Sequence, residues 1–330
     1  AGPDRADASR TAGHPPGELT FALVVPDKGP PAVVLLLDAG DQFSKARQLL
    51  QRGVDAAEKS GVEKSEETVE GTKLVAYKVG GRPEQTPAYF EKDSTLAVGT
   101  NAEVLKQILT AWGGKGAGTL AESEKYAAIS RRSRESKDQE PQFLWFVDPV
   151  MLFRSAAQGN PAMQIALAML PALGIDGLLG VGGSVTLDAG QFDTVMHIHV
   201  LLDNPRSGVI EMLALGSGDT TPERWVPGDV ASYQTLHWKF ATTYKRLVSV
   251  FDSFRGEGAF AKDVKQIEEN LGLDIEKDLL PLLDGRVTHL VWIERPITPN
   301  SRKNLLGLRL KDPASAAKLL EKVAKRLAAL

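Results

Sequence analysis

Histidines are the residues of this chain whose types and spacing come closest to a reactive site. The 330-residue sequence contains five, and four of them fall in stretches predicted as strands: His197, His199, His237 and His289. His197 and His199 are spaced i, i+2, which places both side chains on one face of a strand, as a metal-binding H-x-H pair requires. A third ligand would come from His237 or His289 on a neighbouring strand. This set defines the hypothesis of a metal-dependent enzyme.

The residues around the pair favour a simpler interpretation. Met196, Ile198, Val200 and Leu202 occupy the other face of the same strand, and we expect them to form its core side. The histidines would then lie on the less buried face. No H-E-x-x-H or other diagnostic metal spacing accompanies them. We therefore predict no metal site, no cofactor and no catalytic residue.

Other catalytic patterns are missing from the sequence or incomplete in it. Cysteine is absent, which excludes disulfides, thiolate nucleophiles and cysteine-bound zinc. The glycine-rich segment 112–119 fails the Walker A spacing, because Lys115 is followed by Gly116 instead of Ser or Thr. The segment 177–183 precedes a predicted strand instead of following one, so the dinucleotide fingerprint fails as well. These absences favour a protein that is not an enzyme.

The charge balance argues against nucleic acid as a partner. The formal net charge at pH 7 is −3, with 39 Lys and Arg against 42 Asp and Glu. Nucleic acids and anionic membranes select basic surfaces, which this balance does not supply.

One pattern recurs four times: two apolar strands followed by an amphipathic helix. The copies are 18–25, 32–38 and a helix over 42–58; 72–79, 88–99 and a helix through Trp112; 183–188, 192–202 and a helix from Asn204-Pro205 to about Leu215; and 286–294, 304–311 and a helix from Asp312-Pro313. Such units predict an α+β fold in which antiparallel sheets carry helices on one face.

Short local motifs support these copies. Thr100 and Glu103 form a T-x-x-E capping box, and Asn204-Pro205 and Asp312-Pro313 are typical helix starts. The third and fourth copies also resemble each other in detail, with Gly183-Ser184-Val185-Thr186 matching Gly285-Arg286-Val287-Thr288.

Composition divides the chain into segments. We predict a flexible linker over 1–16, a first α+β domain over 17–215, a linker over 216–222 and a second, incomplete α+β domain over 223–330. Helices are expected in the second domain at 242–254 and 261–271. The charge-rich stretch 63–73 is expected to be a solvated connector, and the aromatic stretch 143–147 a core strand.

The apolar segment 161–187 raises the question of a membrane. Pro171 and several glycines interrupt it, which disfavours a spanning helix. We predict a buried or interface helix from Pro161 to about Leu170, then a glycine-rich turn into a strand. Contact with a membrane surface stays open as an alternative.

Three segments carry a resemblance to a known family. They are Val226-Pro227-Gly228-Asp229-Val230-Ala231-Ser232-Tyr233; Leu271-Gly272-Leu273-Asp274 with Asp278-Leu279-Leu280; and Leu96-Ala97-Val98-Gly99-Thr100 leading to Leu109. In these the chain resembles bacterial extracytoplasmic proteins, common in planctomycetes, that are catalogued as a domain of unknown function. The resemblance implies export and no established activity. In that family the Pro-Gly-Asp-Val opening comes first, whereas here it stands at 227–230.

These observations favour a non-enzymatic, exported scaffold or protein-interaction module in the periplasm or cell envelope, as part of a larger assembly. It would bind a protein partner, or itself, through the apolar segment 161–179. Two alternatives are the metal-dependent enzyme described above and a carrier that holds an apolar ligand between sheet and helices.

Overall fold

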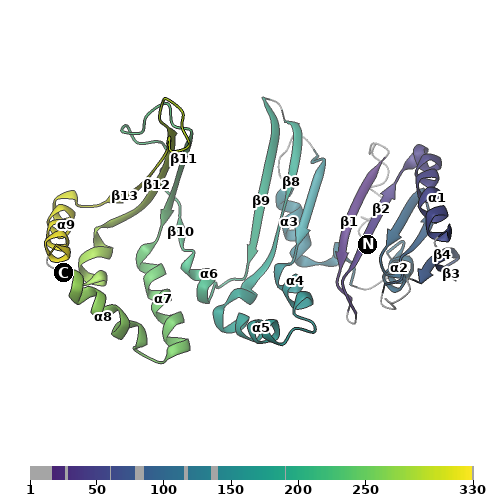
Figure 1. The fold of residues 1–330 in the computed structure, drawn as a ribbon, viewed down its shortest axis with the longest axis horizontal. Coiled ribbons are helices and arrows are strands. Elements are labelled where there is room, and N and C mark those ends of the chain that lie inside the picture. The colour runs from purple at the N-terminus through teal and green to yellow at the C-terminus, as the bar shows by residue number, and fades with distance from the viewer. Residues whose placement is uncertain are drawn as a thin grey trace, which may run out of the picture. The chain divides into compact units, whose positions relative to one another are not determined.

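The computed structural model describes residues 17–26, 29–59, 61–78, 85–114, 118–134, 140–189 and 191–328. In this part of the chain the strands form antiparallel sheets of six, four and three strands, and helices connect them (Figure 1). The predicted α+β class is therefore confirmed. Contacts define two compact units: one runs to Met163 and includes Gly180–His199, and the other joins Gln164–Leu179 to the chain from Val200 onward. The predicted linker 1–16 lies outside the described residues.

The six-stranded sheet of the first unit has the strand order β1-β2-β6-β5-β4-β3. Its strands are β1 (Glu18–Val24), β2 (Ala32–Asp38), β3 (Glu63–Val69), β4 (Thr72–Lys78), β5 (Ala88–Lys92) and β6 (Thr95–Gly99). The hairpin of β1 and β2 leads into helix α1 (Phe43–Lys59), as the first repeat predicts. The two edges of this sheet are β1 and β3.

The strand β3 lies where the sequence predicts a charged connector. It pairs with β4 from Glu63 opposite Lys78 to Val69 opposite Thr72. All of its residues before Val69 are exposed, and Glu66 contacts both Lys64 and Lys73. An edge strand made of polar and charged residues has no apolar period from which it can be predicted, and its charges oppose pairing with a further strand. The connector prediction is therefore wrong.

The second repeat also differs from its prediction. The stretch 88–99 is expected to be one strand, but the chain reverses at Asp93 and Ser94, whose φ angles are +48° and +63°. The result is the hairpin β5-β6, in which Lys92 lies opposite Thr95.

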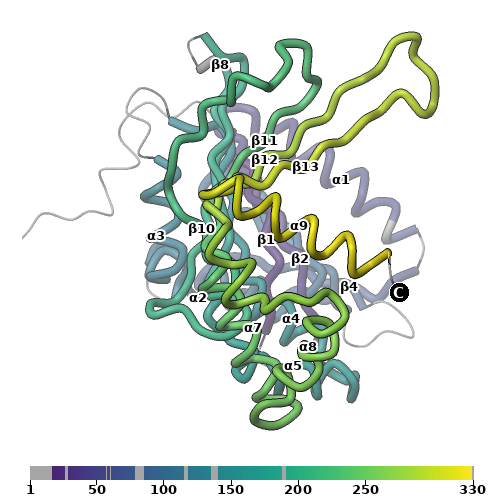
Figure 2. Tube along the Cα trace, turned by 90° about the vertical axis from the view of Figure 1, so that its left-hand side faces the viewer, coloured from purple at the N-terminus to yellow at the C-terminus, as the bar shows by residue number. Residues whose placement is uncertain are grey.

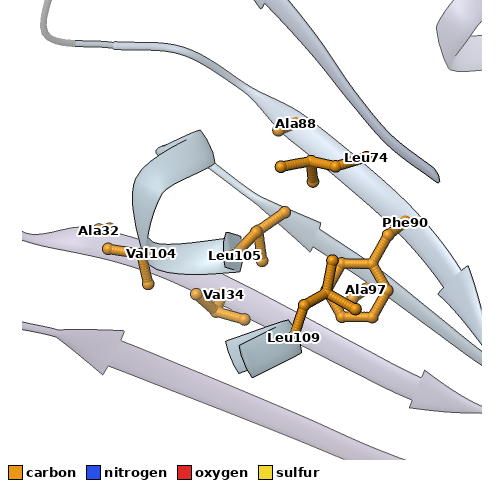
Figure 3. Packing of buried hydrophobic residues seen from close by; sticks show 9 residues of the cluster. All are labelled: Ala32, Val34, Leu74, Ala88, Phe90, Ala97, Val104, Leu105 and Leu109. Atoms are coloured by element: carbon orange, nitrogen blue, oxygen red, sulfur yellow. The ribbon is translucent and has the colours of Figure 1, made fainter. Parts of the chain in front are cut away.

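Helix α2 (Ala102–Ala111) packs on one face of this sheet through the largest buried apolar cluster that the structure describes (Figure 3). Its members are Ala32, Val34, Leu74, Ala88, Phe90, Ala97, Val104, Leu105 and Leu109. The helix begins after Asn101, whose side-chain oxygen accepts hydrogen bonds from the N–H groups of Glu103 and Val104. Thr100 instead accepts a hydrogen bond from the Val33 N–H. The Thr100–Glu103 capping box is therefore wrong by one residue.

Helix α1 covers the opposite face of the same sheet. Ala46 packs against Leu96, and Val54 packs against Val75 and Tyr77. Leu96 precedes Ala97 of the α2 cluster, and successive strand residues point to opposite faces. Helices thus lie on both faces of this sheet, whereas the repeat pattern predicts helices on one face only.

The three-stranded sheet has the order β7-β8-β9. Its strands are β7 (Phe143–Val147), β8 (Leu178–Ala189) and β9 (Phe192–Leu202). The helices of this stretch of the chain are α3 (Glu124–Ser133), α4 (Pro149–Ala156) and α5 (Pro161–Leu173). Helix α3 covers one face, because the Ser184 hydroxyl donates to the Ser133 carbonyl and Phe146 lies edge-on to Tyr126 at 5.9 Å. Phe143 is exposed, so the aromatic strand is only partly core.

The third repeat lacks its predicted long helix. Asn204-Pro205 lies in a bend, and the following helix α6 (Gly208–Met212) is a single turn. The Asn204 side chain therefore caps no helix, and that prediction is wrong.

The four-stranded sheet of the second unit has the order β10-β11-β12-β13. Its strands are β10 (Leu215–Gly216), β11 (Ser232–Trp238), β12 (Leu283–Ile293) and β13 (Arg302–Leu310), and its helices are α7 (Phe240–Arg255), α8 (Ala259–Leu271) and α9 (Pro313–Leu327). The hairpin β12-β13 projects away from these helices (Figure 2). Asp312 caps α9 by accepting from the N–H groups of Ala314 and Ser315, as predicted.

The segment 216–222, predicted as a linker, lies against the four-stranded sheet. Leu215 and Gly216 pair with Trp238 and His237 as strand β10. The hydroxyl of Tyr233 donates to the Thr220 carbonyl at 3.0 Å. This segment therefore belongs to the second unit, and the grouping of contacts changes near residues 163–200 instead.

Candidate functional site

The four strand histidines lie in two different sheets. His197 and His199 stand on β9, His237 on β11 and His289 on β12. The rings of His197 and His199 are nearly parallel, with centroids 6.3 Å apart and an angle of 3° between their planes. Nε2 of His199 is buried and makes no hydrogen bond within the described part of the chain. No group of three or more His, Asp or Glu side chains among the described residues is placed to hold a metal ion.

The two faces of β9 are the reverse of those predicted. His197 and His199 are half-buried, whereas Met196, Ile198 and Val200 are exposed, with Ile198 61% accessible. The alternation is therefore real, but the two histidines lie on the half-buried face together with Val195 and Leu201, and Leu202 is half-buried as well. We call the exposed side chains of Met196, Ile198 and Val200 the β9 surface.

Further apolar side chains are exposed on the neighbouring strands of this sheet. Phe143 lies in β7 and Leu187 in β8, and both are exposed. Phe143 lies opposite Val185 in the β7–β8 ladder, and Leu187 is two residues from Val185, so both lie on one face of that pair. Exposure of an apolar sheet face to water is unfavourable by about 25 cal/mol of free energy per Å² of apolar area.

His237 has a structural partner. Its Nε2 atom lies 2.9 Å from the Asp219 carbonyl oxygen. A Cβ atom on Gly218 would lie 2.4 Å from this ring, so only glycine lets the segment approach so closely. His237 therefore fixes the chain that crosses the sheet, and this role accounts for its position.

A pocket of about 530 Å³ opens between this crossing segment and the sheet. Its charged lining residues are Asp219, Glu223, Arg224, Arg286 and Arg309. Trp225 and Thr288 contribute to the same wall. No histidine is among the lining residues that the structure describes, so the pocket lacks the usual general base.

Arg286 is the centre of this pocket. Its side chain is only 2% accessible, and its Nε atom lies 2.9 Å from Oε1 of Glu223. That contact is electrostatic, because it is not aligned as a hydrogen bond. Its Nη2 atom donates to the Thr221 carbonyl and to the Tyr233 hydroxyl. The guanidinium thus joins β12 to the segment 221–223 and to β11.

The electrostatics of the pocket follow from these pairs. Hydrogen bonds from the side chain and the N–H of Thr221 lower the pKa of Asp219, and the positive charges of Arg286 and Arg309 lower it further. Arg309 also lies 3.4 Å from Asp284. The buried Arg286 charge is thus paired with Glu223 and held by the Thr221 carbonyl and the Tyr233 hydroxyl, which suits a structural clamp better than a reacting centre.

The predicted interaction segment 161–179 forms α5 and the start of β8. Ile165 and Met169 of α5 are exposed, and no residue of this helix is fully buried. The helix prediction from Pro161 is confirmed, although α5 continues through Pro171 to Leu173. No helix within the described ranges has the length and apolar character needed to cross a bilayer.

No catalytic or binding motif in the sequence indicates the Arg286 pocket, but one local match does point to Arg286. Arg286 matches Ser184 in the internal comparison of the third and fourth repeats, and both side chains are buried. Ser184 bonds the Ser133 carbonyl, and Arg286 bonds the Thr221 carbonyl. Arg286 thus occupies the position of a buried residue in the other repeat, and a charged side chain at such a position indicates a buried hydrogen-bonded contact.

Comparison with known proteins finds no matching family model, no matching curated protein and no matching solved structure. The resemblance to the extracytoplasmic family therefore stays a prediction.

Proposed function

We propose that this chain is a non-enzymatic module that binds another polypeptide through the β9 surface. Protein-binding sites are marked by exposed contiguous apolar side chains. Phe143 of β7 and Leu187 of β8 are further exposed apolar side chains of the same sheet that a partner would cover.

One observation carries the proposal: three successive outward-facing side chains of β9 are large, apolar and exposed. The half-buried face carries His197 and His199, and the exposed face carries Met196, Ile198 and Val200. Exposure of these three apolar side chains is unfavourable, because burial of apolar area away from water is favourable. A bound partner removes this cost by covering the apolar side chains.

The alternatives have less support. A metal-dependent enzyme needs a third ligand beside the β9 histidines, and the described residues offer none there. A carrier of an apolar ligand needs an apolar pocket, whereas the pocket around Arg286 is lined by five charged side chains. Ile165 and Met169 of α5 are exposed but belong to the other compact unit, so the predicted contact through 161–179 is not part of this proposal.

The cellular setting rests on the resemblance alone. We infer an extracytoplasmic location in a bacterial cell envelope, where the module would form part of a larger assembly. The partner would be a protein with a complementary apolar surface, and a membrane surface is the competing occupant.

Site-specific photo-crosslinking tests this function. A photoreactive side chain replaces Ile198 in the full chain, and the protein is irradiated in the cells that produce it. The matched control carries the same group at Asp193, which stands on the same strand at a position of opposite parity and is also exposed.

The proposal predicts a protein adduct of one defined mass at position 198 and none at position 193. It also predicts that Met196→Asp abolishes the adduct, because a buried charge without a partner opposes docking. Equal labelling at both positions, no adduct at either, or adducts with lipid alone would overturn it.

A further inference from the structure

The two edges of the six-stranded sheet are built in opposite ways. Strand β3 carries Glu63, Lys64, Glu66 and Glu67, and exposed charges of this kind oppose the addition of a further strand. Glu18, at the first position, is the only charged residue of strand β1, and the strand contains neither lysine nor proline. Within the described residues β1 pairs with β2 on one side only. One edge is protected against pairing, and the other is not.

Strand β1 also exposes large apolar side chains. Phe21 is 68% accessible, and Leu19 and Leu23 on the same face are also exposed. Ala22 and Val24, on the other face, pack against the cluster beneath α2. Val33 and Leu35 of β2 extend the exposed patch. Helix α1 covers β4 and β6 of this face but leaves β1 open.

The sequence of β1 is complementary to itself in one antiparallel register. With Phe21 opposite Phe21 of a second copy, Leu19 lies opposite Leu23 and Thr20 lies opposite Ala22. Phe–Phe and Leu–Leu neighbours across a ladder are favourable pairs. The single charge, Glu18, falls opposite Val24, so no like charges meet.

The same operation applied to β3 fails. Centring the pair on the middle residue of β3 would place Glu66 opposite Glu66. Like charges directly opposite one another in a ladder are destabilising. Charge thus permits a two-fold pair at β1 and opposes one at β3.

We propose that two copies of this chain associate through β1, antiparallel and centred on Phe21, so that the two six-stranded sheets become continuous. The two copies are related by a two-fold axis, so the assembly is complete as a dimer and does not propagate into fibres. This interface is separate from the β9 surface. The two proposals therefore succeed or fail independently.

The absence of cysteine gives this register a direct test. In antiparallel pairs, opposite residues have Cα atoms about 4.5–5.5 Å apart, which is within the range of a disulfide. In the full chain, Phe21→Cys would therefore join the two copies on mild oxidation. Glu18→Cys is the control within β1, because the two cysteines would stand about 20 Å apart at six residues' spacing. Glu66→Cys is the control on the other edge.

We expect the Phe21→Cys dimer to form at least about tenfold faster than either control at equal protein concentration, because pairing raises the local thiol concentration. A second variant, Phe21→Lys, should shift the native chain from dimer to monomer in sedimentation velocity, whereas Leu306→Lys, at a similarly exposed position on β13, should not. Equal oxidation rates for the three cysteine variants, or a monomeric native chain, would overturn the proposal. If Phe21→Cys forms the disulfide dimer but the photoreactive group at position 198 gives no protein adduct, the result counts against the proposed function alone.

Discussion

The Nε atom of Arg286 lies 2.9 Å from the Glu223 carboxylate, and these two residues stand 63 positions apart in the chain. The contact closes the segment 217–225 over the four-stranded sheet, together with His237 beneath Gly218. A buried guanidinium requires such a partner, because an unpaired charge in the interior is strongly unfavourable.

Replacing one member of this pair should destabilise the second unit. Glu223→Ala leaves the Arg286 charge buried, and we expect a loss of about 3 kcal/mol in the free energy of unfolding. The double variant Arg286→Met with Glu223→Leu should recover much of that loss, since no buried charge remains. Urea unfolding curves measure both effects. Arg309→Met is the control, because its exposed contact with Asp284 contributes at most about 1 kcal/mol. Additive losses in the double variant would show that the pair is not coupled.

Gly183 should be intolerant of any side chain. A Cβ atom there would lie 1.9 Å from the carbonyl oxygen of His197, which is a backbone atom of the neighbouring strand. Gly183→Ala should therefore separate β8 from β9 and cost about 3 kcal/mol in unfolding free energy. Gly228→Ala is the matched control, because no atom lies within 4 Å of its Cβ position. Equal thermal stability of the two variants would contradict this placement of β9.

The cap of α9 should make the chain sensitive to acid. The hydroxyl of Ser315, together with the N–H groups of Ser315 and Ala314, lowers the pKa of Asp312. The ionised form is thus favoured in the folded state, and its stabilisation is present above the unfolded pKa of about 3.9 and lost as pH falls through the folded value.

The matched variant for this cap is Asp312→Ser, which keeps a capping oxygen without a titrating group. We expect wild type to be more stable than the variant at pH 7, and the difference to shrink below about pH 4. Asp219 and Asp274, whose pKa values are also lowered, are present in both proteins and cancel in the comparison. A stability difference that is constant from pH 7 to pH 3 would contradict the assignment.

Strong apolar periodicity located most of the elements from sequence. The helices α1, α7, α8 and α9 and the hairpin of β1 and β2 lie within a few residues of their predicted bounds. The strand β3 could not be predicted because its residues before Val69 are all polar or charged, and the reversal at Asp93-Ser94 contains no glycine or proline to indicate a turn.

The faces of β9 and the Arg286 pocket could not be derived in the same way. Alternation assigns residues to two faces, but the choice of the inner face depends on what covers the sheet, and here α3 lies over β7 and β8. Glu223 and Arg286 are distant in sequence, and only the match of Arg286 to the buried Ser184 indicated its position.

Native mass spectrometry of the chain purified from its source without added metal tests whether the β9 surface binds a polypeptide. One spectrum reports bound protein, oligomeric state, metal and small ligands together. We expect a complex with a second kind of polypeptide that is lost in Ile198→Asp and kept in Ile165→Asp, whose side chain is similarly exposed on α5. A stoichiometric metal or lipid adduct without bound protein, or a complex unchanged by Ile198→Asp, would contradict it.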